Sequence, residues 1–447
     1  MRRQHDLRDP LHALARRRRG GRHDPAGARL EEVTVLGAGT VITCASGESV
    51  TIERAFTPGG QGCAYAVRRS RTGAPAVLKL FHDRFDRVET QRRLEYLIAQ
   101  RLGKVCPVLV GPRDLVVSPA GVGYVADLFP GEPLEEVLAR PGLTIFHTLT
   151  LAVALAHAVD SLHSRGVSHG DLHGSNVLVA VTGDTLQPGI IDFDNFAASG
   201  VPAPPMVGQI LYIAPELRAA LRDGRPAIPD LRSDRFAFGV LMHEVVLLLH
   251  PAGGADATPE MFEQAMMNGW VHDPARAGRP KSAGGVPREA INADLQRLFR
   301  LSLSPNPDER PSVGTWKVAL LAALKTVHLC DSCSMPFLVD PSKTACPACG
   351  IGFPDWLLRL RDGRAIPIRQ AAVHVGRALL GGSPKVSSSH AVFRKIGPDL
   401  LVESFGRNGT WRMNGHGWVR LPDRSPIVLA EGDQLRLGDV AVSVVSG

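Results

Sequence analysis

The 447-residue chain has few lysines, few aromatic residues and no long apolar run. Of its 51 basic residues 8 are lysines, and this bias, with the abundant alanine and glycine, indicates a GC-rich genome rather than a special chemistry. The most apolar stretch, residues 238–250, is shorter than the ~20 residues that cross a membrane and is interrupted by His243 and Glu244. No apolar core follows the arginines near the N-terminus, which argues against a secretory signal. We therefore expect a cytoplasmic protein without a membrane partner.

The positive charge of the chain is concentrated at its beginning. Residues 1–30 contain nine arginines and three aspartates, so they supply six of the seven net positive charges. The remaining sequence is nearly neutral, which argues against a nucleic-acid partner for its folded part. We interpret residues 1–30 as a disordered basic tail, either simply solvated or bound to an anionic partner.

Cysteine is also scarce, and four of the seven cysteines form one cluster with the spacing C-x2-C-x12-C-x2-C. Thiolate pairs on two turns predict a tetrahedral site, which Zn²⁺ occupies with bonds of ~2.3 Å. Four protein ligands leave no place for water, so the predicted role is structural, that of a zinc ribbon. Two disulfides are the alternative, which a cytoplasmic location disfavours. The predicted ligands are Cys330, Cys333, Cys346 and Cys349.

Three segments follow the tail. Residues 45–327 have strand patterns first and helix patterns later, which predicts an α+β domain. Residues 328–353 contain the cysteine cluster. Residues 362–447 show short apolar runs separated by turn residues, a pattern typical of an all-β sandwich.

The segment SHGDLHGSNVLV, residues 168–179, brings oxygen donors close to a strand. Asp171 and Asn176 precede the apolar strand pattern that starts at Val177, and Asp192 follows the next strand pattern. A strand–turn–strand unit places these two positions at one edge. Three oxygen donors there suit Mg²⁺ bound to phosphates. The loop alone also fits turn chemistry without catalysis.

Residues 50–325 resemble a eukaryotic-type protein kinase domain. HGDLHGSN resembles the catalytic loop, with Asp171 at the position of the base and Asn176 at the second metal position. IIDFDNF resembles the DFG segment, with Asp192 as the Mg²⁺ ligand. The resemblance implies a bilobal kinase fold that uses ATP and Mg²⁺.

The segment TPGGQGCAYAV resembles the glycine-rich loop, whose backbone amides approach the phosphates at Gly59, Gly60 and Gly62. AVLKL then supplies Lys79 to the α- and β-phosphates.

RLEYLIAQ resembles the helix that carries the carboxylate partner of the lysine, and we choose Glu95 over Glu89 for that role. GYVADLFPGEPL resembles the hinge that binds adenine. It places Ala126 at the gatekeeper position, followed by Asp127 and Leu128.

The catalytic segments also depart from the kinase pattern. The last glycine of DFG is Asp194, and the arginine before the catalytic aspartate is Gly170. The lysine after that aspartate is replaced by His173, which we expect to touch the transferring phosphoryl group when protonated, its usual pKa being ~6.5. A histidine that only forms a hydrogen bond is the alternative. Because Gly170 cannot bind a phosphate, we expect activity without phosphorylation of the activation loop.

HGDLH also occurs in kinases of small molecules, so the acceptor must be inferred from later motifs. APEL supplies Glu216, and NPDERPS supplies Arg310, which the resemblance pairs with Glu216 because an unpaired buried carboxylate is costly. SDRFAFG supplies Asp234, which is implied to hold the catalytic loop. These three motifs indicate a serine or threonine of a protein as the acceptor.

The last 85 or so residues resemble a forkhead-associated (FHA) domain, through VGR, SSSH and RNG. The resemblance implies that Arg377 and Ser387 bind the phosphate of a phosphothreonine, that Ser388 assists and that Asn408 binds the peptide backbone. His390 is implied to support the loops. An arginine suits a phosphate because its planar fork donates two charge-assisted hydrogen bonds.

The complete sequence is thus similar to bacterial serine/threonine protein kinases with a zinc ribbon and an FHA domain. It resembles kinases encoded with tellurite-resistance proteins, which implies a metal-dependent protein phosphatase and a von Willebrand A-type protein as partners. Two alternatives are a pseudokinase scaffold that binds phosphopeptides and a small-molecule phosphotransferase.

Overall fold

The computed structural model describes residues 35–446, except 205–208, 254–263, 274, 276–284, 331, 340–342, 354 and 369–371. The predicted tail at residues 1–30 lies outside the described residues. The chain divides into two compact units. The first, here called the kinase unit, consists of the residues up to Arg288 together with Asp294–Lys325. The second, the C-terminal unit, consists of Glu289–Ala293 and the residues from Thr326 onward.

The kinase unit begins with a six-stranded antiparallel sheet in the order β1-β2-β3-β4-β6-β5. The central strand β4 alternates buried and less buried residues, whereas β6 is buried along nearly its whole length. Helix α2 starts where the Asp86 carboxylate accepts a hydrogen bond from Glu89 N, and it packs on β5 and β6. The elements are β1 (Val41–Thr43), β2 (Ser49–Ala55), β3 (Gly62–Arg69), β4 (Pro75–Phe81), α2 (Arg87–Ala99), α3 (Leu102–Val105), β5 (Pro112–Ser118) and β6 (Gly121–Asp127).

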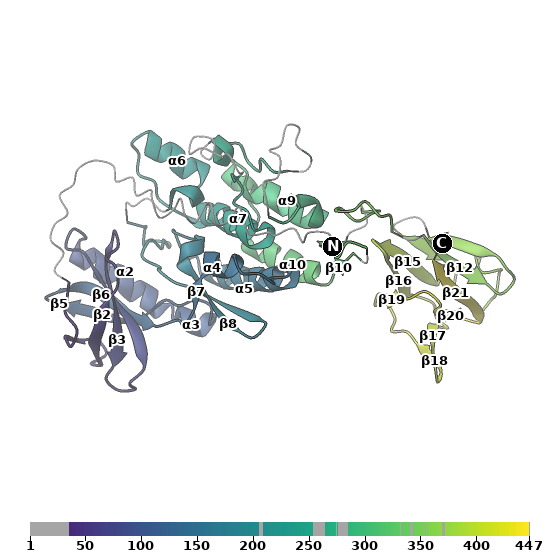
Figure 1. Cartoon of the computed structure of the whole chain (residues 1–447), viewed down its shortest axis with the longest axis horizontal. Helices are drawn as coiled ribbons and strands as arrows, with labels where there is room; N and C mark the ends of the chain where they lie inside the picture. Colours follow the sequence, from purple (N-terminus) through teal and green to yellow (C-terminus); the bar gives the residue numbers. More distant parts are fainter. Residues whose placement is uncertain are drawn as a thin grey trace, which may run out of the picture. The chain divides into compact units, whose positions relative to one another are not determined.

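Helices dominate the rest of the kinase unit, as Figure 1 shows for α5, α7 and α10. The largest are α5 (Ile145–His163), α7 (Leu231–Leu247) and α10 (Val313–Leu324), and α5 packs against both of the others. The others are α4 (Leu134–Leu138), α6 (Pro215–Arg222) and α9 (Ala293–Ser302, in this unit from Asp294 onward), with short 3-10 turns η1 (Gly174–Asn176), η2 (Ile210–Tyr212) and η4 (Pro307–Glu309). The turn η3 (Arg288–Ala290) is divided between the two units.

Helix α5 is the one described helix long and apolar enough to cross a membrane. The expectation that no stretch of the chain approaches the length of a membrane span was therefore wrong. More than half of α5 is buried, and its leucines are covered by α7, α10 and β9. This burial explains its apolar character as that of a core helix.

A small sheet carries the catalytic-loop segment. Strands β7 (Glu132–Pro133), β8 (Val177–Thr182) and β9 (Thr185–Ile190) pair in that order, and Val177 is opposite Ile190. The expected strand–turn–strand unit is therefore present, and it places the residues before β8 beside those after β9.

The C-terminal unit contains a short hairpin and a β-sandwich. The hairpin consists of β10 (Val327–Leu329) and β11 (Pro336–Leu338). A six-stranded sheet in the order β13-β12-β21-β20-β17-β18 and a four-stranded sheet in the order β14-β15-β16-β19 enclose one apolar core. The strands are β12 (Trp356–Leu360), β13 (Ala365–Ile368), β14 (Val373–Val375), β15 (Ala391–Ile396), β16 (Asp399–Ser404), β17 (Thr410–Asn414), β18 (Gly417–Arg420), β19 (Ile427–Leu429), β20 (Gln434–Leu437) and β21 (Val440–Ser446).

Three domain boundaries differ from the expected ones. Strand β1 begins at Val41 and joins the first sheet before residue 45. Val327 already pairs with the hairpin strand β11, one residue before the predicted ribbon. Strand β12 pairs with both β13 and β21, so the sandwich begins at Trp356 rather than at 362. Each strand was missed because its apolar pattern is short. The predicted order of an α+β domain, a cysteine-rich segment and an all-β sandwich is confirmed.

Candidate active site and binding sites

The catalytic-loop segment and the residue after β9 are joined by hydrogen bonds. The side-chain nitrogen of Asn176 donates to Asp171 O at 2.9 Å, and Ile191 N donates to Asn176 O at 2.9 Å. Because its nitrogen binds the backbone, the side-chain oxygen of Asn176 is the atom that a cation would meet. Asp192 follows with a positive φ of 63°, a conformation that non-glycine residues rarely adopt outside functional sites.

Lys79 lies above this edge and is held by two carboxylates. Its Nζ is 2.7 Å from Asp192 Oδ1 and forms a second ion pair with Asp194. Burial opposes the charge of Lys79, but the two carboxylates raise the pKa of its ammonium group above the usual value. Burial and the charge of Asp192 raise the pKa of the Asp194 carboxyl. One cation is therefore shared by two acidic groups.

The prediction that Glu95 pairs with Lys79 is wrong. Glu95 is exposed on α2 and accepts a hydrogen bond from Gln91 at 2.8 Å. The other candidate, Glu89, pairs with Arg92. The reason is the rotation of the helix, which points neither glutamate toward the sheet. The sequence pattern marked Asp194 as a departure but did not identify it as the partner of the lysine.

Asp171 accepts hydrogen bonds at both carboxylate oxygens. Asn195 Nδ2 donates to Oδ2 at 3.3 Å, and Gln209 N donates to Oδ1 at 3.2 Å. Burial opposes ionisation, but the hydrogen bond from His173 and the charges of His173 and His169 lower the pKa of Asp171 below its usual value. The carboxylate is thus ionised near neutral pH and able to accept a proton.

His173 is directed at the base. Its Nε2 lies 3.6 Å from Asp171 Oδ1, and its side chain is 11% exposed. The Nδ1 atom is buried and has no hydrogen-bond partner among the described residues. The ring also lies near that of Tyr212, at 5.7 Å between centroids.

The glycine-rich loop contacts the segment after β9. Gln61 Nε2 donates to Asn195 Oδ1 at 2.7 Å, and Gly59 N donates to Gly62 O at 3.0 Å. A Cβ at Gly62 would clash with Leu80 O, so this glycine is required by the close approach of β4. Gly60 is exposed and has open space around it.

The predicted hinge residues lie at the end of β6. Ala126 is buried opposite Val77, on the same face of the sheet as Lys79. Asp127 forms ion pairs with Arg69 and Arg113, so its side chain is already paired with two arginines. Leu128, which follows, is 39% exposed.

Gly170 occupies its position for a steric reason. Its φ is +76°, and a Cβ there would clash with Asn195 O. An arginine at this position would therefore displace the segment that holds the base. Asp234 accepts hydrogen bonds from Gly170 N at 2.9 Å and from His169 N at 2.5 Å, so the carboxylate holds the loop from α7.

Arg310 and Glu216 form a two-pronged ion pair. Arg310 Nη1 and Nη2 each lie 2.7 Å from a different carboxylate oxygen of Glu216. The arginine side chain is fully buried. The pair joins the start of α6 to the segment before α10, the arrangement that the two motifs imply.

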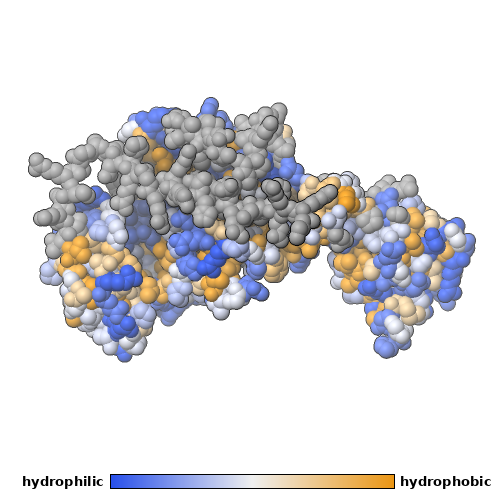
Figure 2. All heavy atoms as spheres, in the orientation of Figure 1, coloured by the Kyte–Doolittle hydropathy of each residue, from blue (hydrophilic) through white to orange (hydrophobic). Residues whose placement is uncertain are grey.

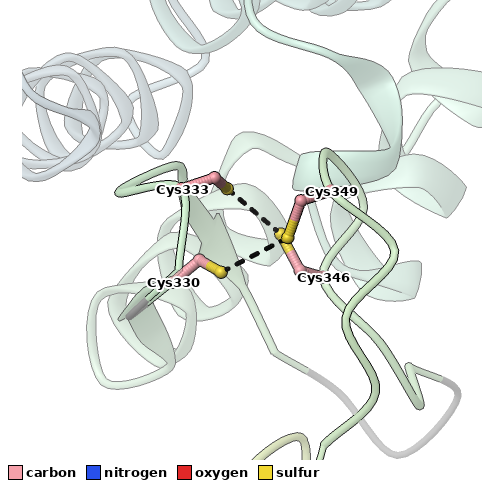
Figure 3. Close-up of side chains that lie close together, drawn as sticks. All are labelled: Cys330, Cys333, Cys346 and Cys349. Atoms are coloured by element: carbon pink, nitrogen blue, oxygen red, sulfur yellow. Dashed lines mark hydrogen bonds between the residues drawn. The ribbon is translucent and has the colours of Figure 1, made fainter.

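The four clustered cysteines converge, as Figure 3 shows. Their sulfur atoms all lie within 4.8 Å of one another, and the pairs Cys330–Cys349 and Cys333–Cys346 are each 3.7 Å apart. A tetrahedron with bonds of ~2.3 Å has edges of about 3.8 Å, so the spacing fits one ion. The cysteines are free, and the alternative of two disulfides is not what the structure contains.

The two cysteine turns have the same backbone pattern. Cys330 N donates to Met335 O and Ser334 N donates to Cys330 O, at 3.0 and 2.8 Å. Cys346 repeats both bonds with Ile351 and Gly350, at 2.9 and 3.0 Å. Ser334 and Gly350 both have positive φ. Two matching turns therefore present four thiols toward one point.

The predicted phosphothreonine residues lie in loops at one end of the sandwich. Arg377 is exposed, and its Nε donates to Val386 O at 2.9 Å. Ser387 Oγ accepts from Arg407 N at 3.3 Å, and Asn408 Nδ2 donates to Lys385 O at 2.8 Å. Ser388 is exposed beside them.

His390 supports these loops from below. It is fully buried, its Nδ1 accepts from Ser387 N at 3.1 Å, and its Nε2 lies 3.0 Å from Gly409 O. The face of the C-terminal unit drawn in Figure 2 has hydrophilic and hydrophobic residues intermixed.

A bilobal α+β domain with this catalytic edge defines a kinase-like fold, and comparison with known proteins identifies it. The protein kinase domain family model matches residues 51–320, more than half of the chain, and the FHA domain model matches residues 363–438. The chain belongs to the protein kinase family and carries an FHA domain. The predicted presence of a kinase domain and of an FHA domain is thereby confirmed.

Two curated relatives resemble the kinase region. Serine/threonine-protein kinase PkaA of Streptomyces coelicolor is 31% identical over 211 residues, which are 46% of this chain and 35% of that protein. Serine/threonine-protein kinase PknA of Mycobacterium tuberculosis is 28% identical over 225 residues, 46% of this chain and 48% of that protein. The chain thus spans about a third to a half of the length of these relatives. The solved structure of vaccinia related kinase 3 covers 66% of this chain and 92% of its own, with a TM-score of 0.50 and 18% identity, which supports the fold alone.

Proposed function

We propose that the chain is an ATP- and Mg²⁺-dependent serine/threonine protein kinase whose FHA domain binds phosphothreonine. The observation that carries this proposal is the convergence of Asp171, Asn176 and Asp192 at one edge below Lys79. Oxygen donors fit Mg²⁺, and Asp192 and Asn176 are the residues that would hold it. The ion would neutralise the charge of the phosphates when bound.

The other contributions to phosphoryl transfer come from side chains and backbone amides of the chain. Lys79 binds the α- and β-phosphates, and the backbone amides at Gly59, Gly60 and Gly62 cover them. The Asp171 carboxylate orients the acceptor hydroxyl and accepts its proton as the oxygen attacks the γ-phosphorus. His173, 3.6 Å from Asp171, stabilises the transferring phosphoryl group when protonated. Adenine lies against the end of β6, at Ala126 to Leu128.

The acceptor is a protein. The Glu216–Arg310 pair fixes the segment that positions a peptide, and Asp234 holds the catalytic loop. Gly170 leaves no arginine beside the base for a phosphorylated activation loop, so we propose activity without that modification.

The C-terminal unit binds ligands of two kinds in this proposal. Zn²⁺ is held by the four thiolates and stabilises the two cysteine turns. A phosphothreonine is bound by Arg377, Ser387 and Ser388, while Asn408 binds the peptide backbone. The phosphothreonine belongs to a protein substrate or to this chain itself. A cytoplasmic location, a metal-dependent phosphatase partner and a von Willebrand A-type partner complete the proposal, and co-purification tests the two partners.

The deciding experiment measures transfer of radiolabelled γ-phosphate to the chain itself and to a generic protein. We expect incorporation by the wild type, mapped to serine or threonine by mass spectrometry. Asp171→Asn should lower it by at least about 100-fold, at the low end of general-base effects. Equal absence of incorporation in both proteins would favour a pseudokinase scaffold. ATP turnover that requires an alcohol or an amino sugar would favour a small-molecule kinase.

A further inference from the structure

The carboxylate partner of Lys79 comes from the segment after β9 and not from α2. Asp194 Oδ2 forms an ion pair with Lys79, and the Asp194 side chain is 1% exposed. Its other oxygen accepts a hydrogen bond from the Tyr124 hydroxyl at 3.2 Å. Tyr124 on β6 is directly opposite Lys79 on β4, so both donors project from one place on the sheet. The buried carboxylate thus has one ion pair, with Lys79, and one hydrogen bond, from Tyr124.

Helix α2 presents the opposite charge at the position that faces this site. Arg93 is buried, and its guanidinium donates to Phe196 O at 2.7 Å and to Asp194 O at 3.2 Å. It also donates to Pro202 O and lies over the ring of Phe196, 4.5 Å from the centroid. Arg93 therefore binds backbone carbonyls between residues 194 and 202, and α2 offers no carboxylate to Lys79 at this position.

We propose that Asp194 positions Lys79 for the nucleotide phosphates, and that Arg93 has replaced the acidic residue which the corresponding helix carries in other kinases. The proposal rests on the proposed function in one respect, that the ligand of Lys79 is a nucleotide. In the usual arrangement the lysine pairs with a glutamate of this helix. Here the carboxylate lies in the segment after β9, and the helix carries the buried Arg93 in its place.

Two physical reasons link the aspartate at position 194 with the arginine at position 93. Asp192 is also a residue that would hold Mg²⁺, so Lys79 needs a second carboxylate to stay oriented when the metal is bound. Asp194 is that group, because it is buried beside Nζ. The Arg93 guanidinium contacts Asp194 O at 3.2 Å, so a glutamate at position 93 would bring a second negative charge close to Asp194 in a buried site, where like charges repel. Positions 93 and 194 are therefore coupled. A glutamate at position 93 is tolerated only with a glycine at position 194, and a glycine at position 194 only with a glutamate at position 93.

The experiment measures the dissociation constant of a fluorescent ATP analogue with Mg²⁺ for the full chain and its variants. Asp194→Asn keeps the shape of the side chain and removes its charge, and we expect binding to weaken about tenfold or more. Arg93→Glu alone should weaken binding at least as much. The double variant R93E/D194G restores the usual arrangement, in which a carboxylate on α2 faces Lys79, and should bind within about threefold of wild type. Arg92→Gln, on the exposed side of the same helix, is the control and should bind as wild type does.

Restored nucleotide binding in R93E/D194G is the decisive result. If Asp194 and Arg93 only supported the fold, a second substitution at a buried position would not restore the binding that the first one weakened. Thermal unfolding of each variant verifies that the kinase unit is folded. Wild-type binding by Asp194→Asn, or loss of binding in Glu95→Gln, overturns the proposal, and so does an R93E/D194G variant that folds but does not bind. Because binding is measured without transfer, a chain that phosphorylates no protein contradicts the proposed function and leaves this test intact.

Discussion

Arg310 meets Glu216 through both guanidinium nitrogens, each 2.7 Å from its own carboxylate oxygen. The arginine is completely buried and also donates to Ser304 O at 3.1 Å, while its guanidinium lies over the ring of Phe236. The pair is thus part of the interior of the kinase unit and joins two segments 94 residues apart.

Removing this arginine should destabilise the kinase unit. Arg310→Met leaves a carboxylate without its partner, and breaking a buried pair costs about 3–5 kcal/mol. Because Glu216 is 30% exposed and remains partly solvated, we expect the lower end of that range. The measurement is the urea unfolding transition of the kinase unit. Arg232→Gln removes an exposed arginine that pairs with Asp308, and this control should leave the transition unchanged. An unchanged transition for Arg310→Met would show that the pair does not contribute to stability.

Zinc removal should affect the C-terminal unit alone. The purified chain is expected to contain one zinc ion per molecule, and Cys346→Ser should reduce this content because three thiolates bind more weakly than four. A strong chelator should lower the melting temperature of the C-terminal unit while that of the kinase unit stays the same. Cys63→Ala, which removes a buried thiol in β3, is the control and should retain zinc. If the purified chain contains no zinc and the chelator leaves the melting temperature unchanged, the four cysteines form a site that needs no ion.

Arg377 should dominate phosphopeptide binding by the sandwich. A charge-assisted hydrogen bond contributes about 1.5–3 kcal/mol, so Arg377→Ala should weaken a phosphothreonine peptide about 10- to 150-fold. Arg377→Lys should rescue this loss only in part, because a lysine lacks the planar fork. Isothermal titration with phosphorylated and unphosphorylated peptides measures both effects. Arg364→Ala removes another exposed arginine of the same unit, paired with Asp362, and should bind normally. Equal binding of the two peptides by the wild type would exclude phosphate recognition.

The sequence predicted the motif residues well where local patterns determine their position. Asp171 and Asn176 precede β8 and Asp192 follows β9, because a strand–turn–strand unit has no other way to pair. The four thiols also converge as their spacing requires. Such positions depend on a few neighbouring residues.

The partner of Lys79 could not be predicted in the same way. Whether Glu95 or Arg93 faces the segment after β9 depends on the rotation of α2, and that rotation follows from the packing of Leu94 on the sheet. The kinase resemblance implies a carboxylate partner on this helix, whereas the partner in the structure is the aspartate at position 194, in the segment after β9. The need for a glycine at position 170 could not be predicted either. It arises from the close approach of the Asn195 backbone, which is distant in the sequence.

The kinase unit should lose stability as the pH falls below about 6.5, because of His243. Its Nε2 accepts a hydrogen bond from Trp270 Nε1 at 3.0 Å, and its Nδ1 lies 2.5 Å from Leu249 O, so the ring is neutral. Burial lowers the pKa of His243 well below its usual value, and the nearby His272, His250 and Arg288 oppose a further positive charge. The unfolded chain therefore binds the proton first, near its usual pKa of ~6.5, so the free energy of unfolding falls with decreasing pH by up to about 1.4 kcal/mol per unit. Thermal unfolding between about pH 5 and pH 7.5 measures this slope, which should be smaller in His243→Gln than in the wild type. Equal slopes in the two proteins would assign the acid sensitivity to other groups.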